Sequence, residues 1–582
     1  MFGFYGRFIM IDLSKKSFCI KTLSDELLSS TLGGKGLATY LLNKMNPLKV
    51  NPLAPDNHII VAIGPFCNSF FWGSSRYGVY TKSPLTNRYA ESYSGGKVPE
   101  AIDSTGFDAI VFKGCSKKPC VVTVHPDGAS FFDAQDLWRT NIFEAEKQAV
   151  KRFSLKRKEY NNPGAIVIGP AGENQVRFAM IANDKWRCAG RTGTGAVLGS
   201  KNLKAVVFHG NSKRTWADIK GIKAYAKEFS KNHIKSPAVQ AYNKMGTTMM
   251  VGLMNTIGAF PAKYWNLGRC DHWEKISGET YHKEHKIKPH ACAKCFMACG
   301  RMATISKGRY KGLTIEGPEY ETIYAFGGLC MVEDIADIAY LNDLCDRLGI
   351  DTITTGNLCG LIMEAKEKKR IDYDLKYGDT KGIECLIKKI VKKEGIGKIL
   401  SKGILVASKE LGLKNIAIHV KGLEPAGYDP RVLKGMGLAF ATSARGACHL
   451  RTTFYKAEIS GMIPPNTIEK KAEKLVDFED KLNIFDSMIL CRFYRDLYPW
   501  EELQETIALA TGISFSEKQL RKIAESILTG TRQFNLNQGL IDSEDSLPER
   551  FYKQPLPSGH KITKEEMQKM LADYYKLRGF SP

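Results

Sequence analysis

The sequence predicts an α+β protein, with a β-rich first part followed by two mainly helical parts. Short runs of Val, Ile and aromatic residues, separated by Gly, Pro and Asn, fill the first two hundred or so residues, as is typical of strands. Beyond them, apolar residues recur at i, i+3 and i+4, which is the helical period. With 582 residues, the chain is longer than one hydrophobic core usually sustains. We therefore expect three domains, at residues 1–210, 211–412 and 413–582.

Six segments of the first part have strand character, and a Pro-Asp-Gly turn after the fifth predicts a hairpin into residues 129–132. The six segments are 8–12, 58–63, 77–81, 109–113, 121–125 and 165–168. Four later segments have helical periodicity. They are 216–231, 335–348, 354–368 and 382–393. The residue pattern changes near residue 412, and we expect one further strand just after this point, at 416–420.

The formal net charge of +23 comes from lysines spread over amphipathic segments rather than from a basic arm. No nucleic-acid recognition motif accompanies them, so the charge indicates either a solvated surface or one that attracts an acidic redox protein.

No apolar run reaches the roughly 18–20 residues of a membrane span, and the N-terminal stretch lacks a cleavage site for secretion. Fifteen cysteines are too dilute for a disulfide scaffold, so we expect a reduced, cytoplasmic protein.

Three cysteines, Cys292, Cys295 and Cys299, stand in a C-x2-C-x3-C run after a Pro-His turn. Three thiolates at this spacing suit a thiophilic metal centre, and we expect them on a loop leading into a helix. A structural zinc site is one alternative, although zinc usually takes two separated pairs of ligands. A radical S-adenosylmethionine enzyme would space the triplet in the reverse order, and chance spacing of buried cysteines is a third alternative. A fourth ligand must come from elsewhere in the chain.

Two distant segments share a pattern, residues 346–351 (the first aspartate segment) and residues 486–491 (the second aspartate segment). Each follows an amphipathic helix, begins with Asp and ends five residues later with Asp or Cys. Gly349, in the first aspartate segment, suits the left-handed backbone conformation that commonly ends a helix. The pair predicts two equivalent binding segments, each of which holds one copy of the same ligand. Cys491 would be the fourth ligand of the metal centre. The alternatives are a helix N-cap for Asp351 and an ordinary surface carboxylate for Asp486.

Together these motifs resemble the tungsten-dependent aldehyde:ferredoxin oxidoreductases, over nearly the whole chain. The landmarks in chain order are 33–36 (GGKG), 75–76 (SR), 81–86 (TKSPLT), 189–191 (AGR), 199–205 (GSKNLKA), the cysteine triplet, 317–322 (GPEYET), 346–351 (DRLGID), 428–431 (YDPR), 448–449 (CH) and 486–491 (DSMILC). The resemblance implies one tungsten, or molybdenum, between two pyranopterins beside a [4Fe–4S] cluster. It also implies that the β-rich domain forms a base for the pterins, under two helical domains.

The same resemblance assigns residues to these cofactors. Cys491 corresponds to the fourth cluster ligand, and Arg76 to an arginine between the cluster and a pterin. The other pterin contacts that it implies are Tyr93, Gly95, Ala189, Gly190, Arg191, Asp346, Ile350, Asp351, Arg451, Asp486 and Leu490. A Mg²⁺ ion would bridge the pterin phosphates.

Glu321 and His449 are the candidate acid–base residues, because carboxylate and imidazole can move protons near neutral pH once burial shifts their pKa values. Taken singly, a capping glutamate and a hydrogen-bonded core histidine are the commoner explanations; the resemblance places both beside the metal. Three positions depart from the family pattern. Tyr93 stands in place of an asparagine near the magnesium and Ile489 in place of a glycine. Tyr340 replaces a glutamate that helps some relatives bind an iron between subunits, which argues against such an iron here.

The resemblance implies an enzyme that interconverts an aldehyde and its carboxylic acid, and that passes electrons one at a time through the cluster to ferredoxin. A second copy of the chain or a small electron-transfer subunit is a further expected partner. One alternative keeps the cofactors but reduces an aromatic acyl-CoA, although nothing in the chain marks a CoA site. The other alternative is a non-catalytic electron-transfer or structural metal protein.

Overall fold

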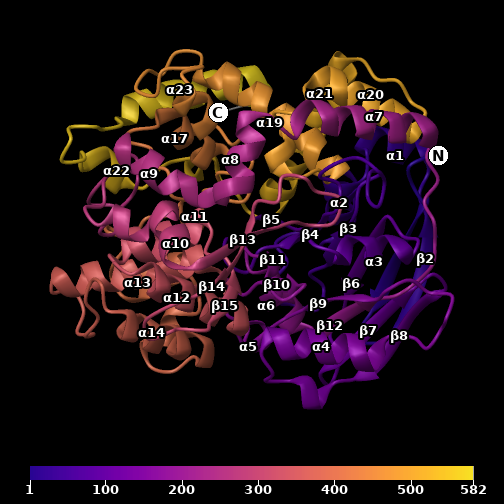
Figure 1. Ribbon diagram of the computed structural model, residues 1–582, viewed down its shortest axis with the longest axis horizontal. Helices are drawn as coiled ribbons and strands as arrows, with labels where there is room; N and C mark the ends of the chain where they lie inside the picture. Colours follow the sequence, from indigo (N-terminus) through magenta and orange to yellow (C-terminus); the bar gives the residue numbers. More distant parts are fainter. Residues whose placement is uncertain (581–582) are drawn as a thin grey trace.

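A computed structural model describes residues 1–580, with most strands gathered in one half of the molecule and mainly helices in the other (Figure 1). The first 208 residues hold two six-stranded sheets. Their strands are β1 (Arg7–Asp12), β2 (Ser17–Thr22), β3 (Ile59–Ala62), β4 (Tyr77–Lys82), β5 (Tyr89–Ser94), β6 (Ala109–Lys113), β7 (Cys120–His125), β8 (Gly128–Asp133), β9 (Gly164–Val167), β10 (Ile181–Asn183), β11 (Arg187–Ala189) and β12 (Leu203–Phe208). The order is β2-β1-β6-β3-β4-β5 in the first sheet and β11-β10-β9-β12-β7-β8 in the second. Only the pairs β1–β6 and β12–β7 are parallel.

The two sheets pack against each other, and each also buries its other face under helices. Along β3, Ile59 and Val61 point into the core between the sheets, whereas Ile60 and Ala62 pack against the helices on the outer face. Burial on both faces explains why this strand is a continuous apolar run rather than an alternating one. The helices of this half are α1 (Asp25–Thr31), α2 (Gly34–Met45), α3 (Val98–Ser104), η1 (Gln135–Leu137), α4 (Ile142–Phe153), α5 (Pro170–Glu173) and α6 (Thr194–Ser200).

The middle of the chain is mainly helical and carries one small antiparallel sheet. Its elements are α7 (Ile219–His233), α8 (Pro237–Met245), η2 (Gly246–Met249), α9 (Met250–Thr256), η3 (Trp273–Ile276), α10 (Gly278–Glu284), β13 (Lys286–His290), β14 (Gly300–Thr304), β15 (Thr314–Glu316), α11 (Tyr320–Thr322), the π-helix η4 (Ile323–Leu329), α12 (Ile335–Leu348), α13 (Thr352–Glu367), α14 (Thr380–Lys392), α15 (Ile396–Leu400) and α16 (Ile404–Glu410). Most of these elements share a single large apolar core with the last part of the chain.

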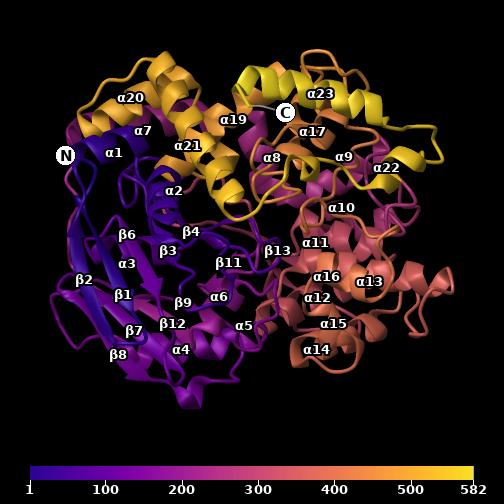
Figure 2. The same cartoon turned by 180° about the vertical axis from the view of Figure 1, so that it is seen from behind.

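The last part is helical throughout and bridges both halves (Figure 2). Its elements are α17 (Lys434–Thr442), α18 (Tyr455–Ile459), α19 (Lys471–Met488), η5 (Arg492–Tyr494), α20 (Trp500–Thr511), α21 (Glu517–Asn537), η6 (Asp542–Glu544), α22 (Glu549–Lys553) and α23 (Lys564–Arg578). Helix α19 packs against α2 on one side and α23 on another, which ties the β-rich half to the C-terminal helices. No helix within residues 1–580 combines the length and apolar character that a membrane crossing demands.

The expected α+β architecture is confirmed, and so are the six predicted strands and the β7–β8 hairpin. The helix expected over 216–231 begins three residues later, because Asp218 caps it by accepting from the amide of Gly221. The strand expected at 416–420 was wrong: the segment makes only an isolated bridge, between Val420 and Leu423. Its apolar residues are buried in the helical core, so they reflect burial on several sides rather than strand alternation.

Candidate functional site

One cavity, of about 370 Å³, lies where the β-rich half meets both helical parts. Its walls come from β5, from the chain after β11, from α11, and from the ends of α12 and α19. Most residues predicted for the site line it: Arg76, Tyr93, Gly190, Arg191, Glu321, Asp346, Ile350, Asp351, His449, Arg451, Asp486, Leu490 and Cys491. Gly95, Ala189 and the cysteine triplet lie outside its walls.

The two aspartate segments adopt the same backbone arrangement at the ends of α12 and α19. In each, the residue that ends the helix is left-handed: Gly349 has φ 79° and Ile489 has φ 56°. The next amides, of Ile350 and Leu490, donate to the carbonyl of the residue before each aspartate, at 3.0 and 2.9 Å. The predicted equivalence therefore extends to the backbone, although Ile489 must hold a conformation that β-branched residues avoid.

The two aspartates differ in the charges around them. Asp486 is 3% exposed and pairs with Arg451 and Arg492, at 2.7 and 2.5 Å. It is therefore not a surface carboxylate. Asp346 has no such cation and accepts a hydrogen bond from Asn342 at 2.8 Å. Burial, and then neighbouring carboxylates, raise the pKa of Asp346 well above its usual range. One segment thus presents a cation-paired carboxylate and the other a carboxyl group that favours its neutral form.

Arg451 is the centre of a buried charge cluster. Besides Asp486, its guanidinium pairs with Glu91 of β5 at 2.5 Å, and Lys35 pairs with the same glutamate at 3.2 Å. Burial alone would raise the pKa of Glu91, but Arg451 and Lys35 bring it down to about 2. Tyr93 donates to Glu91 at 2.7 Å, and the Arg451 guanidinium lies 5.0 Å from the Tyr93 ring. Tyr93 therefore supports the carboxylate that orients Arg451.

The cysteine triplet lies on the loop between β13 and β14, so the expected helix after it was wrong. Lys294 and Ala298 have positive φ values, 50° and 45°, which interrupt a helix within the triplet. Gly300 then begins β14, where a side chain would collide with the carboxylate of Glu316. The loop is half-buried rather than enclosed in the core.

Cys491 reaches this loop from the end of α19. Gly73 connects the two: its carbonyl accepts from the Cys491 amide at 2.9 Å, and its own amide donates to the carbonyl of Lys294 at 3.2 Å. Burial, and then the nearby Cys491, raise the pKa of Cys295 to about 11. Arg76, which also lines the cavity, donates to the Cys491 sulfur at 3.8 Å. Cys491 thus comes close to the cysteine loop although nearly 200 positions separate it from the triplet in sequence.

Glu321 and His449 face each other across the cavity wall, with Glu321 Oε1 3.6 Å from His449 Nε2. The amide of Gly427 donates to Glu321 Oε2 at 3.0 Å. Burial raises the pKa of Glu321 to about 8. Burial, and then nearby arginines, hold the pKa of His449 well below its usual range. At neutral pH the pair is therefore a carboxylic acid beside a neutral imidazole, which is a suitable state for proton transfer.

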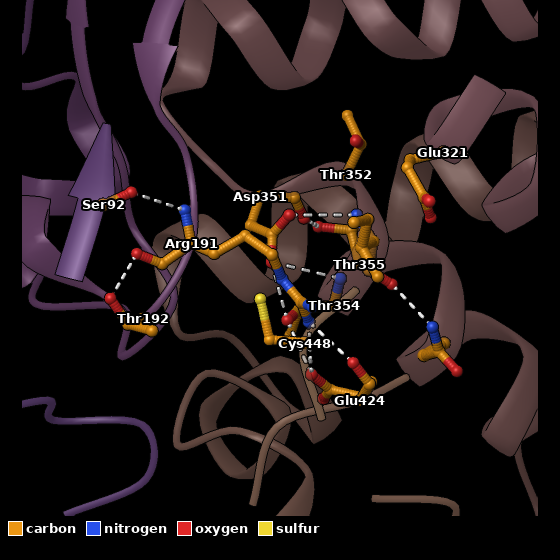
Figure 3. A network of polar contacts seen from close by, with 12 residues as sticks. Ser92, Arg191, Thr192, Glu321, Asp351, Thr352, Thr354, Thr355, Glu424 and Cys448 are labelled. Atoms are coloured by element: carbon orange, nitrogen blue, oxygen red, sulfur yellow. Dashed lines mark hydrogen bonds and ion pairs between the residues drawn. The ribbon is translucent and has the colours of Figure 1, made fainter. Parts of the chain in front are cut away.

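Arg191 joins all three parts of the chain (Figure 3). It leaves the β-rich half just after β11 and pairs with Asp351 at 3.2 Å. It also donates to the carbonyl of Glu424 at 2.9 Å. Asp351 in turn caps α13 and accepts from the hydroxyl of Thr354 at 2.9 Å. The N-cap role, which the sequence offered as the alternative for Asp351, is therefore observed, and the carboxylate serves the ion pair as well.

Several residues of the site were missed by the sequence analysis. They are Glu91, Glu316, Glu424, Arg445 and Arg492. The available signals were weak: Glu91 interrupts an otherwise strand-like run, and Arg492 directly follows Cys491. Neither signal names a partner: Arg451, which pairs with Glu91, lies hundreds of positions away, and nothing local shows that Arg492 turns back to Asp486, six positions earlier.

The cavity suits a polar, anionic cofactor. Several buried polar atoms around it have no partner within residues 1–580: Nε of Arg445 and Arg451, Nε and Nη1 of Arg492, Nδ1 of His449 and Oε1 of Glu321. Buried donors in native proteins are normally satisfied, so guanidinium nitrogens that lack a partner indicate a ligand with acceptor atoms. Arginine is suited to phosphate because its donors form a fixed fork. The lining thus fits a phosphate-bearing pterin.

Comparisons with known proteins agree with this geometry. Residues 8–210 match the family model described as "Aldehyde ferredoxin oxidoreductase, N-terminal domain", and residues 224–582 match "Aldehyde ferredoxin oxidoreductase, domains 2 & 3". The chain is 35% identical over 596 aligned residues to the tungsten-containing aldehyde ferredoxin oxidoreductase of Pyrococcus furiosus, covering 100% of this chain and 97% of that one. It is 34% identical to the protein of the same name from Thermococcus kodakarensis, with the same coverage.

A solved structure shares the fold. The active-site complex BamBC of benzoyl coenzyme A reductase matches with a TM-score of 0.83 and 22% identity, covering 100% of this chain and 95% of that one. At this identity the likeness concerns architecture alone.

Proposed function

Because this chain belongs to the aldehyde ferredoxin oxidoreductase family, we propose that it interconverts an aldehyde and its carboxylic acid and delivers the electrons to ferredoxin. One observation supports this most: both aspartate segments and Cys491 meet at one cavity, with Glu321 and His449 in its wall. On this proposal, that arrangement would bring the cofactor-binding segments, a route for electrons and a route for protons together within one small volume.

A tungsten, or molybdenum, bis-pyranopterin would be held by the two aspartate segments and by Arg76, Arg191 and Arg451. Ala189 and Gly190 would let the backbone approach a phosphate closely, and the backbone at Tyr93 and Gly95 would hold a Mg²⁺ ion that offsets the phosphate charge. When bound, this group accepts two electrons from the substrate, and an iron–sulfur cluster passes them on singly. The remaining chemistry belongs to the side chains of the chain itself.

Cys292, Cys295, Cys299 and Cys491 would hold a [4Fe–4S] cluster. Within residues 1–580, no three His, Cys, Asp or Glu side chains are placed to bind a single metal ion. A cubane spreads its thiolates more widely than one zinc ion does, because each thiolate binds its own iron. Four cysteines supply the one thiolate per iron that such a cluster needs, whereas a structural zinc site usually takes two separated pairs of ligands.

Glu321 and His449 would handle the protons. Protonated Glu321 can donate a hydrogen bond, and then its proton, from its unpartnered Oε1 to the carbonyl oxygen of the aldehyde. Neutral His449 can accept a proton at its buried, unpartnered Nδ1, and its lowered pKa means that it readily gives the proton up again. The partly apolar walls, which include Met250, Ile353 and Leu450, would exclude bulk water from the reacting carbonyl.

Anaerobic purification tests this proposal. The protein should contain tungsten or molybdenum and about four irons per chain, and aldehydes should bleach its visible absorbance and reduce a viologen dye. Zinc as the sole metal would contradict the proposal. Inertness toward aldehydes, with flavin and iron–sulfur subunits that co-purify, would favour the acyl-CoA reductase alternative instead.

A further inference from the structure

Helix α7 carries an unusual stripe of positive charge. Lys220, Lys223, Lys227 and Lys231 are all exposed and follow each other by three or four positions, so they lie on one side of the helix. None of them forms an ion pair with another residue within 1–580, and Glu228 is the one acidic residue of α7. Like charges at this spacing repel and weaken a helix. The stripe is thus a charged surface without internal compensation.

The buried side of the same helix packs against the cysteine loop. The ring of Phe229 lies 6.2 Å from that of Phe296, which directly follows Cys295. Trp72 lies 5.1 Å from the same Phe296 ring and donates its indole N–H to the carbonyl of Ala226 at 2.8 Å. The lysine stripe is therefore separated from the cysteine loop by only one layer of aromatic side chains.

An exposed aromatic residue marks the point where helix and loop meet the surface. Phe70 is 45% exposed, and its ring lies 5.0 Å from Nζ of Lys223 on α7 and 5.7 Å from Nζ of Lys294. Lys294 stands inside the cysteine triplet, and its charge is only partly offset by Glu100 at 4.0 Å. An apolar centre rimmed by uncompensated charge is the usual anatomy of a transient protein interface.

We propose that Phe70, Lys294 and the lysine stripe of α7 form the docking surface for an acidic electron-carrier protein. This rests on the proposed function, in which electrons leave through the cysteine loop. One aldehyde and one water give one acid, two protons and two electrons, so each turnover needs two one-electron transfers to an oxidised carrier. A positive surface beside the exit speeds each encounter with an anionic carrier and orients it.

A charge-reversal pair tests the proposal. Lys223→Glu with Lys227→Glu removes the middle of the stripe; Lys381→Glu with Lys392→Glu is the matched control on α14, where both lysines are likewise exposed and without ion pairs within the described residues. Helix α7 lies at the upper edge and α14 at the lower edge of both views (Figures 1 and 2). With an acidic ferredoxin at low salt, the α7 variant should show a KM for the carrier raised about tenfold or more. Added salt should shrink the difference, because it screens the wild-type attraction.

Two further readouts separate this proposal from the proposed function. Viologen reduction by aldehyde should be unchanged in both variants, since a small dye needs no docking surface. Calorimetric binding of the ferredoxin, which requires no aldehyde chemistry, should weaken only in the α7 variant. An unchanged KM and unchanged binding in that variant, or an equal loss in the α14 control, would overturn the docking surface. A wild-type protein that binds ferredoxin but reduces no viologen with any aldehyde would overturn the proposed function instead.

Discussion

Among single residues, Glu321 gives the most direct test of the chemistry, since burial raises its pKa to about 8. A Gln at this position keeps the shape and a donor but cannot release a proton, so Glu321→Gln should lower kcat about 10²–10³-fold with cluster absorbance intact. If the protonated acid is the active form, wild-type kcat should fall as pH rises past about 8. Steady-state rates with viologen across neutral and alkaline pH measure both effects. An alkaline fall that persists in the variant would exclude this role.

Arg451 tests the buried charge cluster, because two carboxylates depend on it. Arg451→Met would leave Glu91 with Lys35 alone and Asp486 with Arg492 alone. Breaking a buried pair from one side typically costs about 3–5 kcal/mol. Arg521→Met is the control, since Arg521 pairs with three acids but its side chain is 33% exposed. Its loss should cost less than about 1 kcal/mol. Urea unfolding compares the two, and equal effects would contradict a special role for Arg451.

At the scale of elements, two features favour glycine at the C-terminus of α12: the backbone conformation there and the lack of space for a side chain. Gly349 has φ 79°, and a Cβ there would lie 3.0 Å from the amide nitrogen of Gly169. Gly412, with φ 68° and open space around it, would carry the backbone cost alone. That cost is about 1–2 kcal/mol for a left-handed residue with a side chain. Gly349→Ala should therefore destabilise more than Gly412→Ala and should also lower the tungsten content. Equal stability losses in thermal unfolding would show that the close approach is relaxed at little cost.

The elements also show which features a sequence can specify. Local patterns predicted α12 to the residue and the hairpin after β7, since periodicity and turn residues act over short distances. The cysteine loop shows what a sequence pattern leaves open. Its spacing predicted a metal centre. It did not predict that the loop connects two paired strands, β13 and β14, or that two of its residues have positive φ values. The equivalence of the aspartate segments was visible in sequence. The different surroundings of Asp346 and Asp486 were not: Arg451, which pairs with Asp486, stands 35 positions away from it, and the burial that raises the pKa of Asp346 is decided by the whole fold.

At the scale of the whole molecule, Arg191 is a residue of the first part of the chain that contacts both other parts. It is buried in the β-rich half and bonds to Asp351 of the middle part and to Glu424 and Ala447 of the last part. No pattern in the sequence could reveal this, since the partners lie 160 to 256 positions away. A buried guanidinium that satisfies three segments at once favours one relative arrangement of the three, because any other leaves charges unpaired.

Arg191→Met tests whether this contact couples the three parts. The variant removes the cation from two buried carboxylates, so we expect a loss of about 3–5 kcal/mol and a calorimetric transition that broadens or splits as the parts unfold less cooperatively. Arg177→Met is the control: this arginine lies in the same half, its amide donates to the carbonyl of Ser401 across the same boundary, and its side chain forms no ion pair within residues 1–580. The control should keep one transition near the wild-type temperature. A single, equally sharp transition in Arg191→Met would show that packing alone, through the shared apolar core, holds the three parts together.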